Sequence, residues 1–280
     1  MGTINYYISD DAVIFDCYFN QPLDRYTDII KNYKKIIFSN YKDYKICLET
    51  NNEYIGKYNK HYKRSEFNQP IGGALNNLNN LTELTFGDGF NQPIDGALDN
   101  LNNLTKLTFG RSFNHPFSVL LGDLNNLTQL TFGEYFNHPV TGVLDNLKNL
   151  TQLTFGHSFN QPISVLLGDL NNLTMLTLGY CFNQELNIPL NIKILKLDCN
   201  NKIIDNLPNS IEELYLGEYF DSELNNLPNS IKIISFEKDS EYNRKLDNLP
   251  KSLSKLYLPE KYNKKIMNIN EKCVISKKID

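Results

Sequence analysis

A 23-residue repeat constrains this chain more than any other feature of its sequence. Blocks that open on Phe-Asn-Gln/His-Pro and close on Leu-Thr-x-Leu-Thr-Phe/Leu-Gly start at Phe67, Phe90, Phe113, Phe136 and Phe159, and a sixth opens at Phe182. A fixed period of this size is typical of a solenoid, in which each repeat forms one turn of a stack. The repeat therefore predicts an elongated body with an extended surface rather than a catalytic pocket.

The internal pattern of one block predicts how a turn is built. From Glu83 to Phe86, apolar and polar residues alternate as in a short strand with one buried face. The Asn that follows each block-opening Phe is expected to satisfy backbone groups left unpaired at a bend. One turn alone cannot offset the entropy of ordering its residues, so the turns must stack and pair their strands in a parallel sheet.

The same pattern extends beyond the regular blocks. Toward the C-terminus the spacing shortens to 19, 19, 20 and 22 residues, and toward the N-terminus the strand junction recurs at 13–23, followed by a degenerate turn over Tyr41–Glu66. We expect a repeat solenoid, mainly β, with one parallel sheet of short strands and about twelve to thirteen turns of 19–25 residues. The return segments should be irregular or form short helices.

The repeats also predict the organisation of the chain. We expect one solenoid between two short caps. The predicted parts are an N-terminal cap at 1–12, the solenoid at 13–266, with regular repeats at 67–181 and shorter divergent repeats at 182–266, and a C-terminal cap with a Lys-rich tail at 267–280.

Composition limits the partners and the compartment. A net charge of −4 and a pI near 5.7 argue against general attraction to nucleic acid or to an anionic membrane. No stretch approaches the roughly 20 apolar residues of a membrane span, and residues 1–18 lack the pattern of a secretion signal. The five scattered cysteines fit reduced thiols. We expect a cytoplasmic protein, located in the host cell if the source is a virus.

The repeated residues resemble the FNIP repeat family. The motifs FNQPI, LNNLTELTFG, FNHPV and LPNSIEELYLGEYF are similar to that family's consensus, and they recur in phase over roughly residues 13–266. The resemblance implies a fold similar to leucine-rich repeats, a source among social amoebae or giant amoebal viruses, and a role in protein–protein contacts. Many members carry an N-terminal F-box, but here the repeats begin by about Val13, so no F-box is expected.

Three functions follow as hypotheses. The first is a non-enzymatic scaffold that presents an extended strand face to a protein, from a host or from the ubiquitin pathway. The second is the substrate-recognition component of a ubiquitin ligase, joined through a separate adaptor. The third is a structural protein without a specific ligand. We expect no cofactor, no metal, no nucleic acid and no membrane as partners, and a monomer.

Several motifs have a structural interpretation that we favour over a chemical one. Asn-Leu-Thr sequons recur in five successive turns, at Asn80, Asn103, Asn126, Asn149 and Asn172. Without a secretion signal, this repetition favours a role in the fold over glycosylation. His115 and His138 replace Gln in adjacent turns, and two ligands do not make a metal site. No P-loop, HExxH or nucleophile-elbow motif is present.

A binding surface is predicted where aromatic residues follow the strands. Tyrosine is favoured at interfaces because it offers a large area and a hydroxyl group at low entropic cost. The candidate partner-binding residues are Tyr135, His157, Tyr180, Tyr215 and Tyr219. The alternative is that these are partly packed aromatics at the rim of the solenoid.

Overall fold

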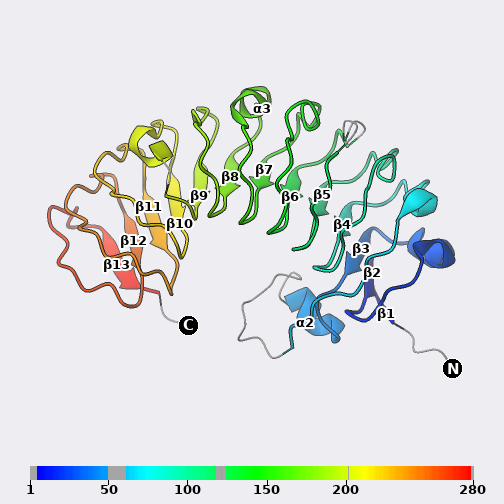
Figure 1. The fold of residues 1–280 in the computed structure, drawn as a ribbon. Helices are drawn as coiled ribbons and strands as arrows, with labels where there is room; N and C mark the ends of the chain where they lie inside the picture. Colours follow the sequence, from blue (N-terminus) through cyan, green and yellow to red (C-terminus); the bar gives the residue numbers. More distant parts are fainter. Residues whose placement is uncertain (1–4, 50–60, 118–120, 122–123, 201, 279–280) are drawn as a thin grey trace. The chain divides into compact units, whose positions relative to one another are not determined.

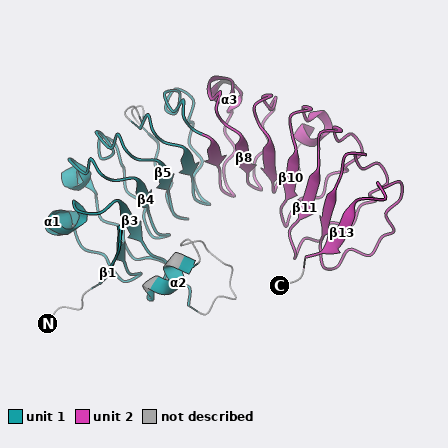
Figure 2. Cartoon of the chain, turned by 180° about the vertical axis from the view of Figure 1, so that it is seen from behind, with its two compact units in different colours: residues 1–150 teal, residues 151–280 magenta. Residues whose placement is uncertain are grey.

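The computed structural model describes residues 5–49, 61–117, 121, 124–200 and 202–278 of the chain. The chain is divided into two compact units, one of residues 1–150 and one of residues 151–280 (Figure 2). Within each unit the strands lie side by side along one face, and the return segments, with their short helices, lie along another (Figure 1). Each unit is thus a β-solenoid, as the repeat predicts.

The first unit contains six strands whose spatial order follows the chain. β1 pairs with β2 in antiparallel fashion, and the later strands pair in parallel. The strands are β1 (Tyr6–Ser9), β2 (Ala12–Phe15), β3 (Lys35–Phe38), β4 (Glu83–Thr85), β5 (Lys106–Thr108) and β6 (Gln129–Thr131). The helices are the 3-10 helices η1 (Leu23–Tyr26) and η2 (Gly72–Leu75) and the α-helices α1 (Thr27–Ile30) and α2 (Tyr44–Glu49).

The second unit contains seven strands, again in chain order. From β7 to β13, each strand pairs with the next in parallel fashion. The strands are β7 (Gln152–Thr154), β8 (Met175–Leu178), β9 (Ile194–Leu197), β10 (Glu213–Leu216), β11 (Ile233–Phe236), β12 (Lys255–Leu258) and β13 (Val274–Lys277). The helices are α3 (Ser164–Asp169) and the 3-10 helix η3 (Lys202–Asn206). No helix in the described part of the chain has the length and apolar character needed to cross a membrane.

The register of the sheet stacks equivalent residues of successive turns. Leu84, Leu107 and Leu130 pair in sequence and are fully or almost fully buried. Their neighbours Glu83 and Lys106 pair on the opposite face and are only half-buried. The predicted alternation is therefore confirmed.

One predicted turn does not form. Ile36 of β3 pairs directly with Leu84 of β4, so the degenerate turn expected over Tyr41–Glu66 adds no strand among its described residues. The segment instead contains α2, and its residues 50–60 lie outside the described part. The ring of Phe38 stacks on Phe67 at 3.9 Å, which closes the core beneath the insertion.

The number of turns is accordingly lower than expected. Four complete turns lie between β2 and β6, six lie between β7 and β13, and one further turn contains the boundary of the units. The described strands thus give about eleven turns rather than twelve or thirteen.

Phenylalanine rings form the core beside the leucine column. Phe86 stacks on Phe90 of the same turn at 4.1 Å between ring centroids and on Phe109 of the next turn at 5.6 Å. Phe90 stacks on Phe113 at 6.1 Å. Each turn therefore presents two rings to the next, and apolar area is buried only when turns stack.

The asparagine of each regular block forms a ladder. The backbone N–H of Asn91 donates to Oδ1 of Asn68 at 2.8 Å, and that of Asn114 donates to Oδ1 of Asn91 at 3.0 Å. The same bond joins Asn183 to Asn160 at 2.9 Å. Each side chain thus satisfies a backbone group of the following turn, which confirms the predicted structural role.

A glycine after the strand permits the turns to approach closely. A Cβ atom on Gly110 would meet the carbonyl group of Gly87, and one on Gly179 would meet the carbonyl group of Gly156. Both neighbours are backbone atoms, which cannot move aside without changing the stacking distance. Glycine at this position is therefore a steric requirement.

Candidate interaction surface

Three of the predicted binding residues come together in the second unit. The His157 ring lies 5.0 Å from the Tyr180 ring in a stacked arrangement, and the Tyr180 ring lies 5.0 Å from the Tyr219 ring, edge to face. Tyr180 is 47% exposed and Tyr219 is 49% exposed. Aromatic groups that pack on one another yet remain half accessible are suited to an interface.

The loops after the strands bring these rings together. His157 and Tyr180 each directly follow the glycine that ends a strand, and Tyr219 lies two residues after Gly217. The turn between those of Tyr180 and Tyr219 has Cys199 in its equivalent loop, and the Cys199 side chain is buried. Because the Cys199 side chain is small and buried, it leaves room for Tyr180 and Tyr219 to meet.

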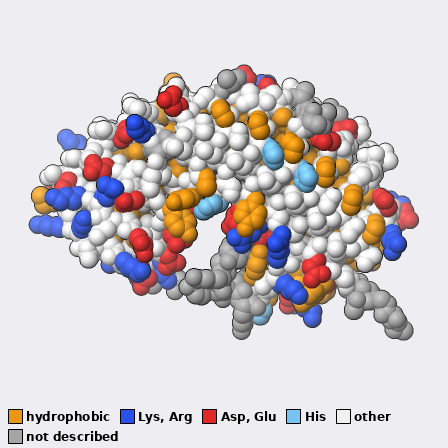
Figure 3. Space-filling model, in the orientation of Figure 1, with side chains coloured by type: hydrophobic (Ala, Val, Ile, Leu, Met, Phe, Trp, Pro, Cys, Tyr) orange, Lys and Arg blue, Asp and Glu red, His pale blue; other side chains and the backbone are white. Residues whose placement is uncertain are grey.

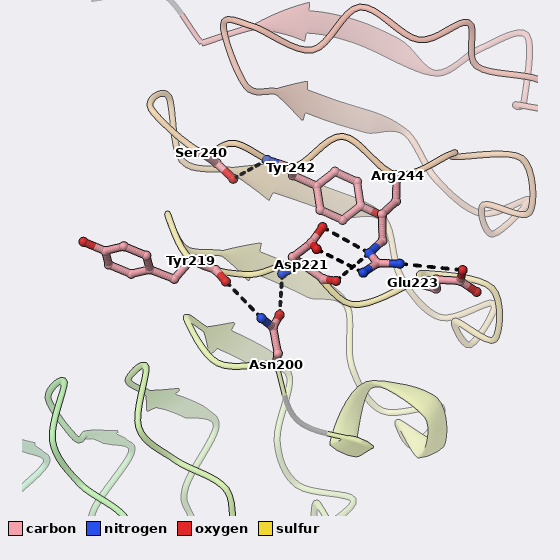
Figure 4. Close-up of polar contacts among 7 residues, drawn as sticks. All are labelled: Asn200, Tyr219, Asp221, Glu223, Ser240, Tyr242 and Arg244. Atoms are coloured by element: carbon pink, nitrogen blue, oxygen red, sulfur yellow. Dashed lines mark hydrogen bonds and ion pairs between the residues drawn. The ribbon is translucent and has the colours of Figure 1, made fainter.

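The turn before Tyr219 holds its backbone in place (Figure 4). The Tyr219 N–H donates to Oδ1 of Asp198 at 3.0 Å, and Nδ2 of Asn200 donates to the Tyr219 carbonyl at 3.3 Å. Oδ1 of Asn200 also accepts the N–H of Asp221. Two side chains of one turn therefore fix the loop that presents Tyr219.

Asp198 is the most perturbed carboxyl group near the rings. Burial raises its pKa above the ordinary value for aspartate, while the hydrogen bond from the Tyr219 backbone and the nearby His157 oppose the shift. Loss of solvation destabilises the charged form of a carboxyl group, which explains the direction. Asp198 thus combines partial burial with a hydrogen bond that holds the loop.

A groove of about 620 Å³ runs beside Tyr219. Its lining residues are Glu218, Tyr219, Phe220, Asp221, Glu241, Tyr242, Asn243 and Arg244. On the face shown in Figure 3, side chains of both charges lie interspersed over β10 to β13. The groove is therefore mixed in character, with an aromatic wall and charged borders.

The guanidinium of Arg244, which lines this groove, is bound by neighbouring carboxylates. Its Nε and one terminal nitrogen donate to the two carboxylate oxygens of Asp221 at 3.1 and 3.0 Å, and its other terminal nitrogen lies 3.8 Å from Glu223. Figure 4 shows the guanidinium enclosed by these groups, with the Tyr219 ring pointing away. A fork-to-fork pair of this kind fixes the orientation of both partners. Arg244 therefore organises the groove rather than offering a free cation.

The other two predicted residues lie elsewhere. Tyr135 belongs to the first unit, where it is 46% exposed and lies 5.5 Å from the guanidinium of Arg111. Tyr215 lies on β10, half-buried, and donates to Oε2 of Glu213 at 2.7 Å. Burial, followed by this hydrogen bond, raises the pKa of Tyr215 to about 12. The structure thus assembles three of the five residues into one cluster.

The residues that support the cluster were not among those predicted. Asp198 and Asn200 are polar residues on a short loop, and their role depends on contacts between turns about 20 residues apart. The aromatic residues after the strands could be recognised in the sequence because they recur in phase with the repeat. A signal did exist in the change from Gly-Tyr at 179–180 to Asp-Cys at 198–199, which marks a turn that departs from the repeat.

The two histidines and the Asn-Leu-Thr motifs make contacts between turns, as their structural interpretation predicts. Nε2 of His115 lies 3.1 Å from the Asn91 carbonyl, and Nε2 of His138 lies 3.1 Å from the Asn114 carbonyl. The sequon residue Asn103 donates through Nδ2 to a carbonyl of the preceding turn at 2.6 Å. No group of three or more potential metal ligands is found among the described residues.

Comparison with known proteins agrees with this architecture. The model of the FNIP Repeat family matches residues 182–219 and 199–239. Over 97% of its length the chain is similar to CroV588, a circular leucine-rich-repeat protein of a giant virus, with 28% identity and a TM-score of 0.50. The chain spans 45% of that protein's length. No curated protein matches the chain.

Two more distant structures share the fold. The chain covers 31% of Toll from the Drosophila Toll–Spatzle complex, over 91% of its own length, with 14% identity and a TM-score of 0.52. An internalin of Listeria monocytogenes is 18% identical over 75% of this chain and 72% of its own, with a TM-score of 0.43. The Toll similarity shows a leucine-rich-repeat-like solenoid and nothing more specific.

Proposed function

We propose that this chain, an FNIP repeat protein with a leucine-rich-repeat-like fold, is a non-enzymatic scaffold that binds a protein. Solenoids of this kind are typical of interaction scaffolds because their stacked turns present an extended surface. The observation that carries the proposal is the cluster of His157, Tyr180 and Tyr219. Its rings are held by the loops of three turns and remain accessible to a partner.

The proposal includes the setting of this interaction. The five cysteines are free thiols, which supports a reducing compartment such as the cytoplasm, that of the host cell if the source is a virus. The partner would be a host protein or a component of the ubiquitin pathway, bound by a monomer of this chain. Neither nucleic acid nor a membrane is part of the proposal.

Capture from a lysate of amoebal cells tests the proposal. The tagged full chain is compared with a Tyr180→Ala/Tyr219→Ala double variant, and recovered proteins are quantified by mass spectrometry. We expect one protein whose recovery falls about ten-fold in the variant, because the ring pair supplies the central contacts. Ubiquitin-ligase subunits among the tyrosine-dependent proteins would favour, among the three hypotheses, a substrate-recognition component of a ubiquitin ligase.

A matched control makes the comparison specific. Tyr18 is also exposed, at 39%, but Lys63 lies 3.8 Å from its ring centroid. Tyr18→Ala should therefore recover the same protein as the unmodified chain. Equal recovery from all three chains, with circular dichroism showing each to be folded, would refute the proposed surface.

A further inference from the structure

The tetrapeptide Gly-Glu-Tyr-Phe occurs once in each unit, at residues 133–136 and 217–220. In both places it follows a strand, its Phe is buried in the ring stack, and its Tyr is exposed. Tyr135 is 46% exposed and Tyr219 is 49% exposed. The chain thus contains two copies of one local structure in different surroundings.

The copy in the first unit holds an arginine. Arg111 reaches it from the preceding turn, and its Nε lies 2.5 Å from Oε2 of Glu134. The guanidinium carbon lies 5.5 Å from the centroid of the Tyr135 ring. A carboxylate and an aromatic face are the two groups that a guanidinium binds best in proteins. The Glu-Tyr pair therefore acts here as an arginine-binding site that the chain itself fills.

The copy in the second unit lacks this arginine. Arg111 lies two residues after the buried Phe109, and the equivalent position two residues after Leu197 is Cys199, whose side chain is buried. Among the described residues, Glu218 forms no ion pair, and no Lys or Arg lies over the Tyr219 ring. The second Glu-Tyr pair is thus the same site without its cation.

The surroundings of the second copy favour a cation from outside. Tyr180 lies 5.0 Å from Tyr219 and adds a second exposed ring. Glu241 borders the adjacent groove and, like Glu218, has no ion pair with any residue in the described part of the chain. Arg244 is held by Asp221 and Glu223, so it does not neutralise these carboxylates. Two carboxylates without an ion pair in the described part of the chain therefore lie beside accessible rings.

We propose that Glu218 and Tyr219 bind an arginine side chain of a partner protein, in place of the arginine that the chain supplies to Glu134 and Tyr135. This inference rests on the proposed function and adds the chemistry of the partner, a basic segment with at least one accessible arginine. Arginine fits better than lysine because its planar group can face a ring and bind a carboxylate at once.

Peptide binding by the purified full chain tests this directly. The probes are fluorescein-labelled hexa-arginine and hexa-citrulline, which has a similar shape but no charge, and the readout is fluorescence anisotropy. We expect hexa-arginine to bind about ten-fold more tightly than hexa-citrulline. Glu218→Gln and Tyr219→Ala should each weaken hexa-arginine about five-fold, because each removes half of the site.

The first unit provides matched controls. Glu134→Gln and Tyr135→Ala should leave the affinity within about two-fold, because Arg111 already occupies that pair. Arg111→Ala should vacate it and raise the number of hexa-arginine peptides bound per chain from one to two. Circular dichroism must show this variant to be folded, because an unfolded acidic chain would also bind a polycation.

Three results would overturn the inference. They are equal affinity for the two peptides, equal loss from the variants of the two Glu-Tyr pairs, or no binding of hexa-arginine at about 1 mM, where even a weak site fills. If peptide binding fails while capture still depends on Tyr180 and Tyr219, the proposed function stands and only the arginine chemistry is wrong.

Discussion

The regular turns and the short turns of this chain fill the same positions with different groups. After the regular strand β8, a glycine packs on the backbone of the preceding glycine. In the short turns, the glycine position one turn before Gly217 is occupied by Asp198. The side chain of Asp198 accepts the Tyr219 N–H. Asn200 then joins two backbone groups of the next loop, whereas Asn91 accepts one backbone N–H.

This difference shows how a repetitive fold acquires a distinctive surface. In the regular turns the same Asn bond recurs from turn to turn. In the first short turn, Asp198 and Asn200 hold the next loop instead, and Tyr219 on that loop is exposed. The candidate surface lies where the regular turns that carry His157 and Tyr180 meet the shorter turns.

The largest effect on stability should come from adding a methyl group to a glycine that follows a strand. Gly179→Ala places Cβ against a backbone carbonyl, and we expect the free energy of unfolding to fall by about 3 kcal/mol or more. Gly217→Ala meets the Asp198 side chain, from Cβ to Oδ1, rather than a backbone carbonyl, so a smaller loss of about 2 kcal/mol is expected. Urea denaturation measures both.

A third glycine serves as the control for this pair. Gly168 lies in α3 and has no neighbouring atom within 4 Å of an added Cβ. Gly168→Ala should therefore raise the free energy of unfolding by about 0.5 kcal/mol through helix propensity. If Gly217→Ala proved as damaging as Gly179→Ala, the short turns would be as rigid as the regular ones.

An intermediate effect is expected where tyrosine replaces phenylalanine in the ring stack. Tyr242 is buried, and its hydroxyl has no hydrogen-bond partner among the described residues. Tyr262 instead donates its hydroxyl hydrogen to the Arg244 carbonyl at 3.1 Å. Tyr242→Phe should raise the free energy of unfolding by about 1 kcal/mol, whereas Tyr262→Phe should lower it by about 1 kcal/mol. Changes of the same sign in thermal unfolding would contradict this assignment.

The smallest effect concerns the carboxyl group that holds Tyr219. Because burial raises the folded-state pKa of Asp198, its favourable contribution is complete below about pH 3.8, the unfolded-state value, and is lost as the pH rises through the raised pKa. Asp198→Asn keeps an oxygen acceptor without the charge. We expect it to gain about 0.5 kcal/mol at neutral pH, after allowance for solvent screening, and nothing at pH 3.

Urea midpoints measured from pH 3 to pH 7 check this prediction. The difference between the unmodified chain and the variant should grow with pH over that range. A difference that is constant with pH would show that the charge of Asp198 is not the cause.

The fold was largely predictable because its physics repeats. The strand column of Leu84 and its equivalents, the Asn ladder and the glycine positions all recur in phase, so one turn predicts the next. The segment after β3 could not be predicted, because an insertion has no repeat to compare with. At the surface, the rings of His157, Tyr180 and Tyr219 were recognisable as residue types, but their association depends on Asp198 and Cys199, which break the pattern.

The asparagine ladder has a consequence for how such a chain can change in length. Asn68, Asn91 and Asn114 each accept the backbone N–H of the equivalent Asn in the following turn, so the joints between these turns are alike and have the same direction. Duplicating or deleting one 23-residue unit in phase would restore this bond at the new junction. Whole turns can therefore be gained or lost with the ladder intact, while single substitutions in the loops diversify what the surface binds.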